Sequence, residues 1–299
     1  MQLYIWNMEL LNLNGKIVST TSGLISPNSR GFRYGDGVFE TMICRENLIH
    51  FADDHINRLI NGLTVLDFAV PTNYTTAYFT GQINDLLKEN EHNKTARIRL
   101  TAFRDEGSLY DETNEIPNFI IQTWALQDSI GKWNEKGLVL GICTYIKKSC
   151  DSLCNLKHNN FLPYVMGANL AKRNNWNDAV MLNCYGRVCD TTIANIFLIK
   201  NKMVYTPALQ EGCVAGVIRK NLIGHLINNN IEVIEKELTI EDLMQADELF
   251  VTNSIHNIQW VQNIAGKKYT NNLTRSIYES FTALPVNYKI YCPSLLLYH

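Results

Sequence analysis

Three segments of the chain carry residues whose types and spacing could support catalysis. Lys157 stands in a polar, turn-prone stretch just before an apolar-periodic run that predicts a helix over residues 161–174. Asp190 follows a glycine turn and precedes a predicted strand. Further on, Gly212–Arg219 places two glycines ahead of another helical pattern, as a backbone cradle for a phosphate would.

Lys157 and Asp190 can each also be explained without any role in catalysis. A lone lysine is usually a solvated surface charge, and Asp190 could cap the turn before Thr191 and Thr192. Taken together, however, a lysine nucleophile, an acid and an anion site are what an enzyme needs to hold pyridoxal phosphate (PLP) as a Schiff base. The three segments therefore predict a PLP enzyme.

The composition is that of a globular protein and argues against several functions. The chain has 299 residues, of which 46% are hydrophobic, and a formal net charge of -2 with a pI near 6.4. This length predicts one large or two smaller domains, and without a block of Lys or Arg we expect no nucleic-acid partner. No apolar run approaches the roughly 20 residues that cross a bilayer, and no signal peptide is recognisable. We therefore expect no membrane partner and a cytoplasmic location.

The cysteines point to neither a disulfide framework nor a metal site. Eight cysteines in 299 residues are too few for a disulfide-dense scaffold. Cys150 and Cys154 could form a ligand pair, but no second pair follows at zinc-like spacing. We expect reduced, mostly buried thiols and no metal.

The first part of the chain is predicted to be rich in strands, followed by two helices. Asn14-Gly15 predicts a hairpin, and three glycines within residues 29–37 predict a sharp bend or a close backbone approach. One helix is expected to begin at Asp53, and a second covers about residues 75–90. The expected strands are residues 3–6, 16–18, 37–44, 96–103 and 118–124.

The second part alternates strands and helices after a stretch without apolar patterning. We take that stretch as a linker, so the predicted domains are residues 1–125 and 133–299, joined by residues 126–132. The expected helices are residues 161–174, 217–229, 240–245 and 272–283, and the expected strands are 137–145, 179–184, 195–200, 203–206, 231–235 and 248–252. The elements predict a mixed α and β fold.

Several motifs, in this order along the chain, resemble those of the class IV aminotransferases, which are the fold-type IV PLP enzymes. They extend from Arg30 to about Val261 and so cover most of the chain. The motifs are Arg30-Gly-Phe-x-Tyr-Gly-Asp-Gly-Val-Phe-Glu-Thr41, His55-Ile-Asn-Arg58, Lys157, Gly186-x-Val-x-Asp190 with Asn195-Ile-Phe, Gly212-x-x-x-Gly216-x-x-Arg219 and Ala246-Asp-Glu-Leu-Phe-Val-Thr-Asn-Ser254.

This resemblance implies pyridoxal 5'-phosphate as the cofactor and a role for each matching residue. Lys157 would hold PLP as a Schiff base and then move the substrate proton as a base. Asp190 stands where the family has a glutamate that keeps the pyridine nitrogen protonated. Arg58 matches an arginine that contacts the phosphate, although it could also be an exposed helical charge.

Further positions would surround the same cofactor. The backbone N–H groups of Val217 and Ile218 would bind the phosphate, with Ser254 as another contact. Val214 would pack on the pyridine ring, but an ordinary core valine would be buried in the same way. Asp190 is one methylene shorter than glutamate, and Ile218 lacks the threonine hydroxyl of many relatives. These two departures favour the remote alternative of a non-catalytic scaffold with the PLP-enzyme fold.

The residues near the lysine help to distinguish branches of the family. Asn160 and Leu162 replace the glycine and tyrosine typical of branched-chain enzymes, so the run after Lys157 looks like those of the aminodeoxychorismate lyases and D-amino-acid aminotransferases. Phe39 replaces a tyrosine of the D-amino-acid branch. Arg104 resembles an arginine of the lyase and D-amino-acid groups that could bind a substrate carboxylate, or it is a surface arginine on a polar loop.

Amino transfer is the most common activity that the family implies. We therefore expect transfer of an amino group between an α-amino acid, branched-chain-like or otherwise small, and a 2-oxo acid. The alternative is a 4-amino-4-deoxychorismate lyase, which forms 4-aminobenzoate and pyruvate for folate synthesis. The resemblance also implies a small N-terminal and a larger C-terminal α/β domain with PLP in the cleft between them. It implies a homodimer with the active site near its interface.

Overall fold

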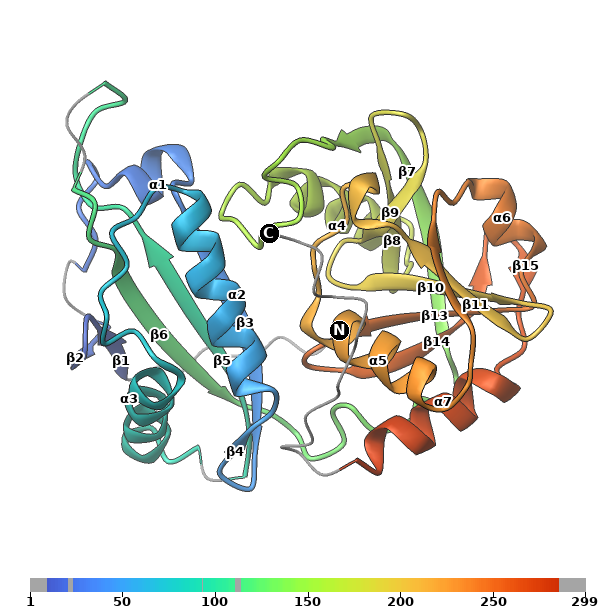
Figure 1. Ribbon diagram of the computed structural model, residues 1–299, viewed down its shortest axis with the longest axis horizontal. Coiled ribbons are helices and arrows are strands. Elements are labelled where there is room, and N and C mark those ends of the chain that lie inside the picture. Colours follow the sequence, from blue (N-terminus) through green and yellow to red (C-terminus); the bar gives the residue numbers. More distant parts are fainter. Residues whose placement is uncertain (1–9, 21–23, 93, 111–113, 285–299) are drawn as a thin grey trace. The chain divides into compact units, whose positions relative to one another are not determined.

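The chain forms a mixed α/β structure built on two β-sheets, as the sequence predicts. The structure, a computed structural model, describes residues 10–20, 24–92, 94–110 and 114–284. It divides into two compact units: the chain up to residue 130 together with residues 156–160, and residues 131–155 together with the chain from residue 161 (Figure 1). The segment that carries Lys157 thus belongs to the first unit, whereas the sequence places it in the C-terminal domain.

The first unit contains a six-stranded sheet in which all neighbouring strands are antiparallel. The strand order is β2-β1-β6-β5-β3-β4. Asn14 and Gly15 join β1 to β2 with φ values of 50° and 86°, the left-handed backbone that a two-residue hairpin turn requires. The strands are β1 Leu10–Leu13, β2 Lys16–Ser19, β3 Gly37–Arg45, β4 Leu48–Ile49, β5 Thr95–Phe103 and β6 Asn118–Ala125.

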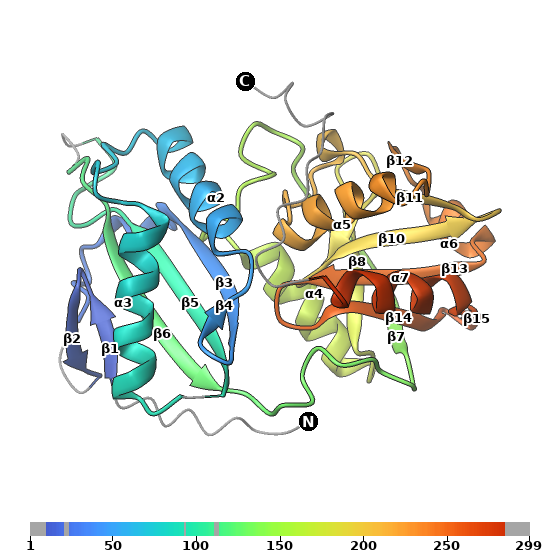
Figure 2. The ribbon, with the colours of Figure 1, turned by 60° about the horizontal axis from the view of Figure 1, so that its bottom comes forward.

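Helices α2 (Ala52–Val65) and α3 (Thr76–Glu89) cover one face of this sheet (Figure 2). The side chains that α2 buries include Ile56, Leu59 and Leu63, the apolar stripe that the sequence predicts. They pack on every second residue of β3 and β5, because successive side chains of a strand point to opposite faces. A short helix, α1 (Arg30–Tyr34), replaces the loop expected at that position.

The second unit contains a nine-stranded mixed sheet. Its order is β12-β11-β10-β13-β14-β7-β8-β9, and β15 pairs with β14. Strands β9, β14 and β15 are absent from the sequence prediction, which has only turns or irregular chain at these positions. The strands are β7 Leu138–Lys148, β8 Asp178–Asn183, β9 Val188–Thr191, β10 Asn195–Lys200, β11 Met203–Pro207, β12 Val233–Lys236, β13 Glu248–Asn253, β14 Asn257–Ile264 and β15 Lys267–Lys268.

In the described part of the second unit, four α-helices accompany this sheet, at the positions that the sequence predicts. Helix α4 (Leu162–Arg173) lies along β7 and β8, while α5 (Val217–Asn228) and α7 (Asn272–Thr282) contact each other and β13 (Figure 2). Helix α6 (Ile240–Gln245) begins with a capping box at Thr239, and a single 3-10 turn covers Leu209–Glu211. Helix α5 buries residues on all sides, so its N-terminus is held in the interior of the unit.

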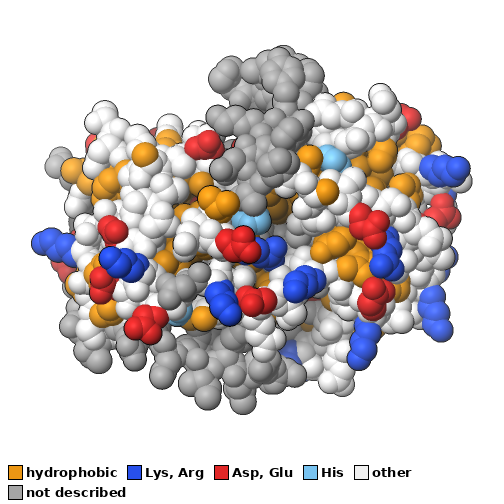
Figure 3. All heavy atoms as spheres, turned by 90° about the horizontal axis from the view of Figure 1, so that it is seen from below, with side chains coloured by type: hydrophobic (Ala, Val, Ile, Leu, Met, Phe, Trp, Pro, Cys, Tyr) orange, Lys and Arg blue, Asp and Glu red, His pale blue; other side chains and the backbone are white. Residues whose placement is uncertain are grey.

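Other expectations concern the surface and the cysteines. On the face shown in Figure 3, Lys and Arg side chains are interspersed with Asp and Glu. No helix within the described ranges is long and apolar enough to span a bilayer. The seven cysteines in those ranges are free, and no group of three His, Cys, Asp or Glu side chains there is arranged as metal ligands. The predicted strand at residues 3–6 lies outside the described residues.

Candidate active site

Lys157 is fixed in the first unit by backbone pairing with the start of β3. The N–H of Phe39 donates to the carbonyl of Lys157 at 2.8 Å, and the N–H of Asn159 donates to the carbonyl of Gly37 at 2.9 Å. The lysine side chain is half-buried, and its Nζ lies 4.7 Å from the centroid of the Phe39 ring. Lys157 is therefore not the solvated surface charge that a lone lysine usually is.

The glycines before β3 make this close approach possible. A Cβ on Gly37 would lie 2.3 Å from the carbonyl oxygen of Ala102 and 2.7 Å from Nδ2 of Asn159. Gly35 has a φ of 69°, and a Cβ there would lie 2.5 Å from Oδ1 of Asn160. The glycine-rich loop thus both bends and admits the lysine segment, as its sequence predicts.

Arg58 is held on helix α2 by a buried carboxylate. Its Nε and Nη2 donate to the two oxygens of Glu40 at 2.7 and 2.6 Å, and Nδ1 of His55 lies 2.6 Å from Oε2 of the same carboxylate. The Arg58 side chain is only 16% exposed, so it is not the free helical charge of the alternative explanation. This bidentate pair orients the guanidinium.

The charge states in this cluster follow from burial and pairing. Burial alone would raise the pKa of Glu40, but Arg58 and His55 lower it to about 2, so the carboxylate stays ionised. Burial lowers the pKa of His55 in spite of the attraction of Glu40, so the imidazole is neutral near pH 7. A neutral His55 donates its Nδ1–H to Glu40. Neither Glu40 nor His55 was singled out from the sequence, although both lie in the motifs that carry the resemblance.

A second cation, Arg99 of β5, lies on the same Phe39 ring. Its guanidinium carbon is 3.8 Å from the ring centroid, and its Nε donates to Thr101 Oγ1 at 3.1 Å. Burial and the neighbouring charge of Arg97 lower the pKa of Arg99 to about 10, which marks a position where an anion would be stabilised. The sequence signal is two arginines spaced by two on one strand, which places both on one face.

Arg104 and Phe39, the predicted substrate-binding residues, differ in how they are held. Arg104 is buried, and its nitrogens donate to Asp36 at 3.0 Å and to the carbonyls of Asn114 and Leu66 at 3.1 and 2.6 Å. It is therefore not a surface arginine, and a substrate carboxylate would have to compete with these three acceptors. Phe39 lies beside Lys157 and Arg99, as described above.

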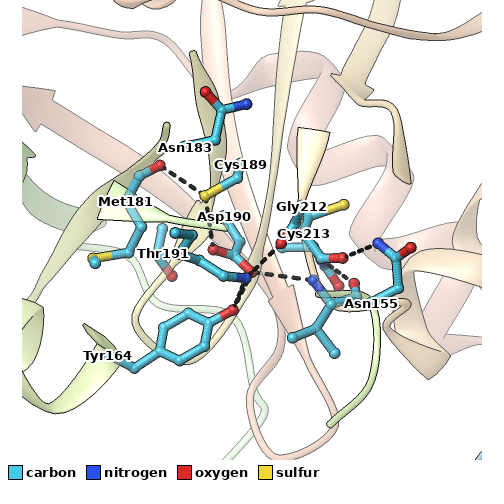
Figure 4. A network of polar contacts seen from close by, with 12 residues as sticks. Asn155, Tyr164, Met181, Asn183, Cys189, Asp190, Thr191, Gly212 and Cys213 are labelled. Carbon is cyan, nitrogen blue, oxygen red and sulfur yellow. Dashed lines mark hydrogen bonds and ion pairs between the residues drawn. The ribbon is translucent and has the colours of Figure 1, made fainter. Parts of the chain in front are cut away.

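In the second unit, Asp190 lies in strand β9 at the centre of a polar network (Figure 4). Its Oδ2 accepts from the hydroxyl of Tyr164 at 2.7 Å, from Nζ of Lys148 at 3.2 Å and from the N–H of Val214 at 3.2 Å. The alternative of a turn cap is wrong for Asp190. Asp178 has that role, since its Oδ1 accepts from both the N–H and the hydroxyl of Thr192.

Lys148 and Tyr164 are members of the site that sequence reasoning missed. Nζ of Lys148 donates to the Tyr164 hydroxyl, to Asp190 and, at 2.6 Å, to the carbonyl of Gly212. Burial alone would lower the pKa of Lys148, but the carboxylate of Asp190 raises it above its usual value. Burial and Asp190 raise the pKa of Tyr164 well above its usual range. Lys148 is thus an ammonium, and Tyr164 is a neutral phenol.

Two asparagine side chains form hydrogen bonds with the loop before α5. Nδ2 of Asn195 donates to the carbonyl of Val214 at 2.8 Å, and Nδ2 of Asn155 donates to the carbonyl of Cys213 at 2.7 Å. A Cβ on Gly216 would lie 1.9 Å from Oδ1 of Asn195, so only glycine fits there. Val214 therefore contacts two side chains: its N–H donates to Asp190, and its carbonyl accepts from Asn195.

Asn195 contacts both the loop before α5 and strand β13. Gly216 has no side chain to cap α5, so the first N–H groups, which include those of Val217 and Ile218, need an acceptor from outside the helix. Asn195 pairs with Thr252 of β13, and Ser254 follows two residues later. The turn at Ser254 is shaped by Asn253, whose Oδ1 accepts from the N–H groups of Ile255 and His256.

The sequence matches a known family over most of the chain. Residues 37–264 match the amino-transferase class IV family. The chain belongs to this family. Its members are PLP-dependent aminotransferases and lyases, so the protein is an enzyme of this PLP-dependent group.

Individual relatives divide between two activities. The chain is 29% identical over 238 residues to the aminodeoxychorismate lyase of Vibrio harveyi, which covers 79% of this chain and 86% of that one. It is 28% identical over 277 residues to a putative branched-chain-amino-acid aminotransferase of Methanocaldococcus jannaschii, covering 90% and 94%. The branched-chain aminotransferase of Thermoproteus uzoniensis shares the fold with a TM-score of 0.82 at 22% identity, covering 92% and 94%.

The residues present suit the cofactor of the family. Solved branched-chain aminotransferases with this fold contain pyridoxamine 5'-phosphate or a phosphopyridoxyl derivative of glutamate. Such a group needs an amine, an acid for the ring nitrogen and donors for the phosphate. The chain supplies Lys157, Asp190, Arg58 and an uncapped helix N-terminus behind Gly216, where a side chain at 216 would obstruct the loop.

Proposed function

We propose that the protein is a PLP-dependent aminotransferase that moves an amino group between an α-amino acid and a 2-oxo acid. The observation that carries the proposal is the Phe39 ring with Lys157 on it at 4.7 Å and Arg99 on it at 3.8 Å. Lys157 supplies the amine that the proposed chemistry needs, and Arg99 supplies a guanidinium that can bind a substrate carboxylate. The apolar ring between them suits the hydrocarbon part of a small amino acid.

Each remaining residue has a role in holding the cofactor. When bound, PLP supplies an aldehyde that condenses with amines and a ring that withdraws electrons from the reacting carbon. Lys157 would provide the amine, while Arg58, oriented by Glu40, and the N–H groups of Val217 and Ile218 at the uncapped start of α5 would bind the phosphate. Asp190 would hold a proton on the ring nitrogen. Val214 would pack on the ring, and Ser254 would add a phosphate contact.

The lysine amine is also the group that moves the proton during amino transfer. It must be unprotonated to take a proton from the substrate, and its half-buried position on the face of Phe39 reduces its contact with water. Arg99 would hold the substrate carboxylate beside it, with Arg104 as the second candidate. Lys148 is unsuited to the role of Lys157, because Asp190 keeps it an ammonium.

The lyase remains the second candidate because of a specific run of residues. Lys157-His-Asn-Asn160-Phe-Leu162 resembles the lyase branch, and the Vibrio harveyi relative is a lyase. A lyase would use the same amine and the same acid but release pyruvate and 4-aminobenzoate. We further propose a homodimer in the cytoplasm, where the free thiols of the described residues would stay reduced.

The test is to mix the PLP-loaded protein with single L- and D-amino acids and to follow the cofactor spectrum. Conversion to the pyridoxamine form by L-valine, L-leucine or L-glutamate, reversed by a 2-oxo acid, would support an aminotransferase. Spectral silence with all amino acids, together with 4-aminobenzoate release from aminodeoxychorismate, would show a lyase instead. Lys157→Ala is the inactive reference, and Lys172→Ala, on the outer surface of α4, is the matched control.

A further inference from the structure

The direction of the hydrogen bonds around Asp190 is determined by chemistry. An ammonium can only donate, so Lys148 donates to the oxygen of Tyr164. The single proton of the Tyr164 hydroxyl is then free to be donated to Asp190, and the 2.7 Å distance shows this bond. The network therefore runs from Lys148 through Tyr164 to Asp190, and Lys148 also donates directly to the carboxylate.

The network also balances the charge of a carboxylate that has almost no contact with water. Asp190 is 2% exposed, and a buried carboxylate remains ionised only with a counter-charge and donors. The other titratable groups around it are the thiols of Cys154, Cys189 and Cys213, whose pKa values are all raised mainly by burial, so they are neutral. Among the described residues, Lys148 is the cation that pairs directly with Asp190.

We propose that Lys148 and Tyr164 are positioning residues that hold Asp190 as an oriented carboxylate for the ring nitrogen of the cofactor. This inference rests on the proposed function. Asp190 is shorter than the glutamate that the family resemblance leads one to expect, and it reaches less far. The two donors on Oδ2 together with the N–H of Val214 fix the short side chain in one orientation.

The first experiment measures the affinity of the cofactor-free protein for PLP. Tyr164→Phe keeps the ring, which packs on Phe161 at 4.3 Å between centroids, and removes only the hydroxyl. Loss of one hydrogen bond to a charged group should weaken PLP binding about tenfold. Tyr145→Phe removes a half-exposed hydroxyl from the same unit, one that donates to a carbonyl in α4, and should leave the affinity unchanged.

The second experiment separates positioning from mere structural support. With PLP labelled at the ring nitrogen, the 15N chemical shift reports whether that nitrogen is protonated. Tyr164→Phe and Lys148→Met should both move the signal towards the unprotonated value, because each removes a group that holds the charge on Asp190. Lys148→Arg, which keeps the cation, should restore the signal towards that of the wild type, and Lys147→Met on the exposed side of β7 should not change it.

The outcomes distinguish this inference from the proposed function. A wild-type protein that takes up no PLP overturns the proposed function and the inference with it. A wild type that binds PLP, with Tyr164→Phe showing the same affinity and the same 15N shift, overturns the inference alone. If Lys148→Met does not fold, Tyr164→Phe decides the question, because it changes no charge.

Discussion

The buried Glu40 offers the sharpest test of how the first unit holds Arg58, the arginine that we propose binds the phosphate. Glu40→Gln keeps the shape of the side chain and removes its charge. The amide oxygen can replace only one of the two carboxylate oxygens, so Arg58 keeps at most one of its two hydrogen bonds to this side chain, and the amide NH2 group faces a donor of Arg58 or His55. We expect the variant to be less stable and to bind PLP more weakly, since Arg58 loses its bidentate partner.

The magnitude follows from the pKa of Glu40. Pairing lowers it from 4.5 to about 2, and the side chain is 1% exposed, so solvent screening is small. Each tenfold change in acidity is equivalent to about 1.4 kcal/mol, so the ionised carboxylate contributes about 3 kcal/mol to the free energy of unfolding at pH 7. This lies in the range of about 3–5 kcal/mol for breaking a buried ion pair.

The pH dependence has a definite sign. Because the pKa is lower in the folded protein than in the unfolded chain, the contribution is fully present above about pH 4.5. It decreases as the pH falls and is lost near pH 2. The difference in unfolding free energy between wild type and Glu40→Gln should therefore shrink over that window.

The assay is urea unfolding of both proteins at pH 7 and pH 3.5, combined with hydrogen exchange of the backbone amides. Faster exchange is expected in α2, with little change in α7 of the second unit. Glu89→Gln on the exposed face of α3 is the matched control and should alter stability by less than about 0.5 kcal/mol. A loss below about 1 kcal/mol at pH 7, or a loss that does not change with pH, would refute the reasoning.

Three further outcomes are expected. Lys157→Ala should fold and bind PLP only reversibly, so mass spectrometry after borohydride treatment should find no cofactor attached to the chain. If the cofactor is found attached to this variant, another lysine forms the Schiff base. Gly216→Ala should lower stability by about 1–3 kcal/mol in thermal melts and weaken PLP binding, because its Cβ would displace Asn195. Gly81→Ala in α3 is the control: its Cβ would meet no neighbouring atom within 4 Å, so this variant should raise stability by about 0.5–1 kcal/mol. Arg99→Met should raise the KM for the amino donor at least tenfold without changing PLP affinity, and an unchanged KM would exclude Arg99 as the carboxylate anchor.

Local patterns in the sequence determined many of the elements and several site residues. The apolar stripe of α2 and the alternation of β5 depend on periodicities of about 3.6 and 2 residues, which a single chain displays without any partner. The glycines before β3 and at position 216 stand where an added Cβ would collide with neighbouring atoms. Such glycines can also be recognised in the local sequence. Lys157 was recognised through its place among the motifs.

The tertiary structure alone decided which charges face one another. Asp190 is 42 residues from Lys148 and 26 from Tyr164, and Glu40 is 18 from Arg58, so no local pattern links these pairs. Strand β9 was missed for the same reason: its four residues become a strand by pairing with β8. A buried side chain takes its charge from neighbours that only the folded chain brings within hydrogen-bonding distance.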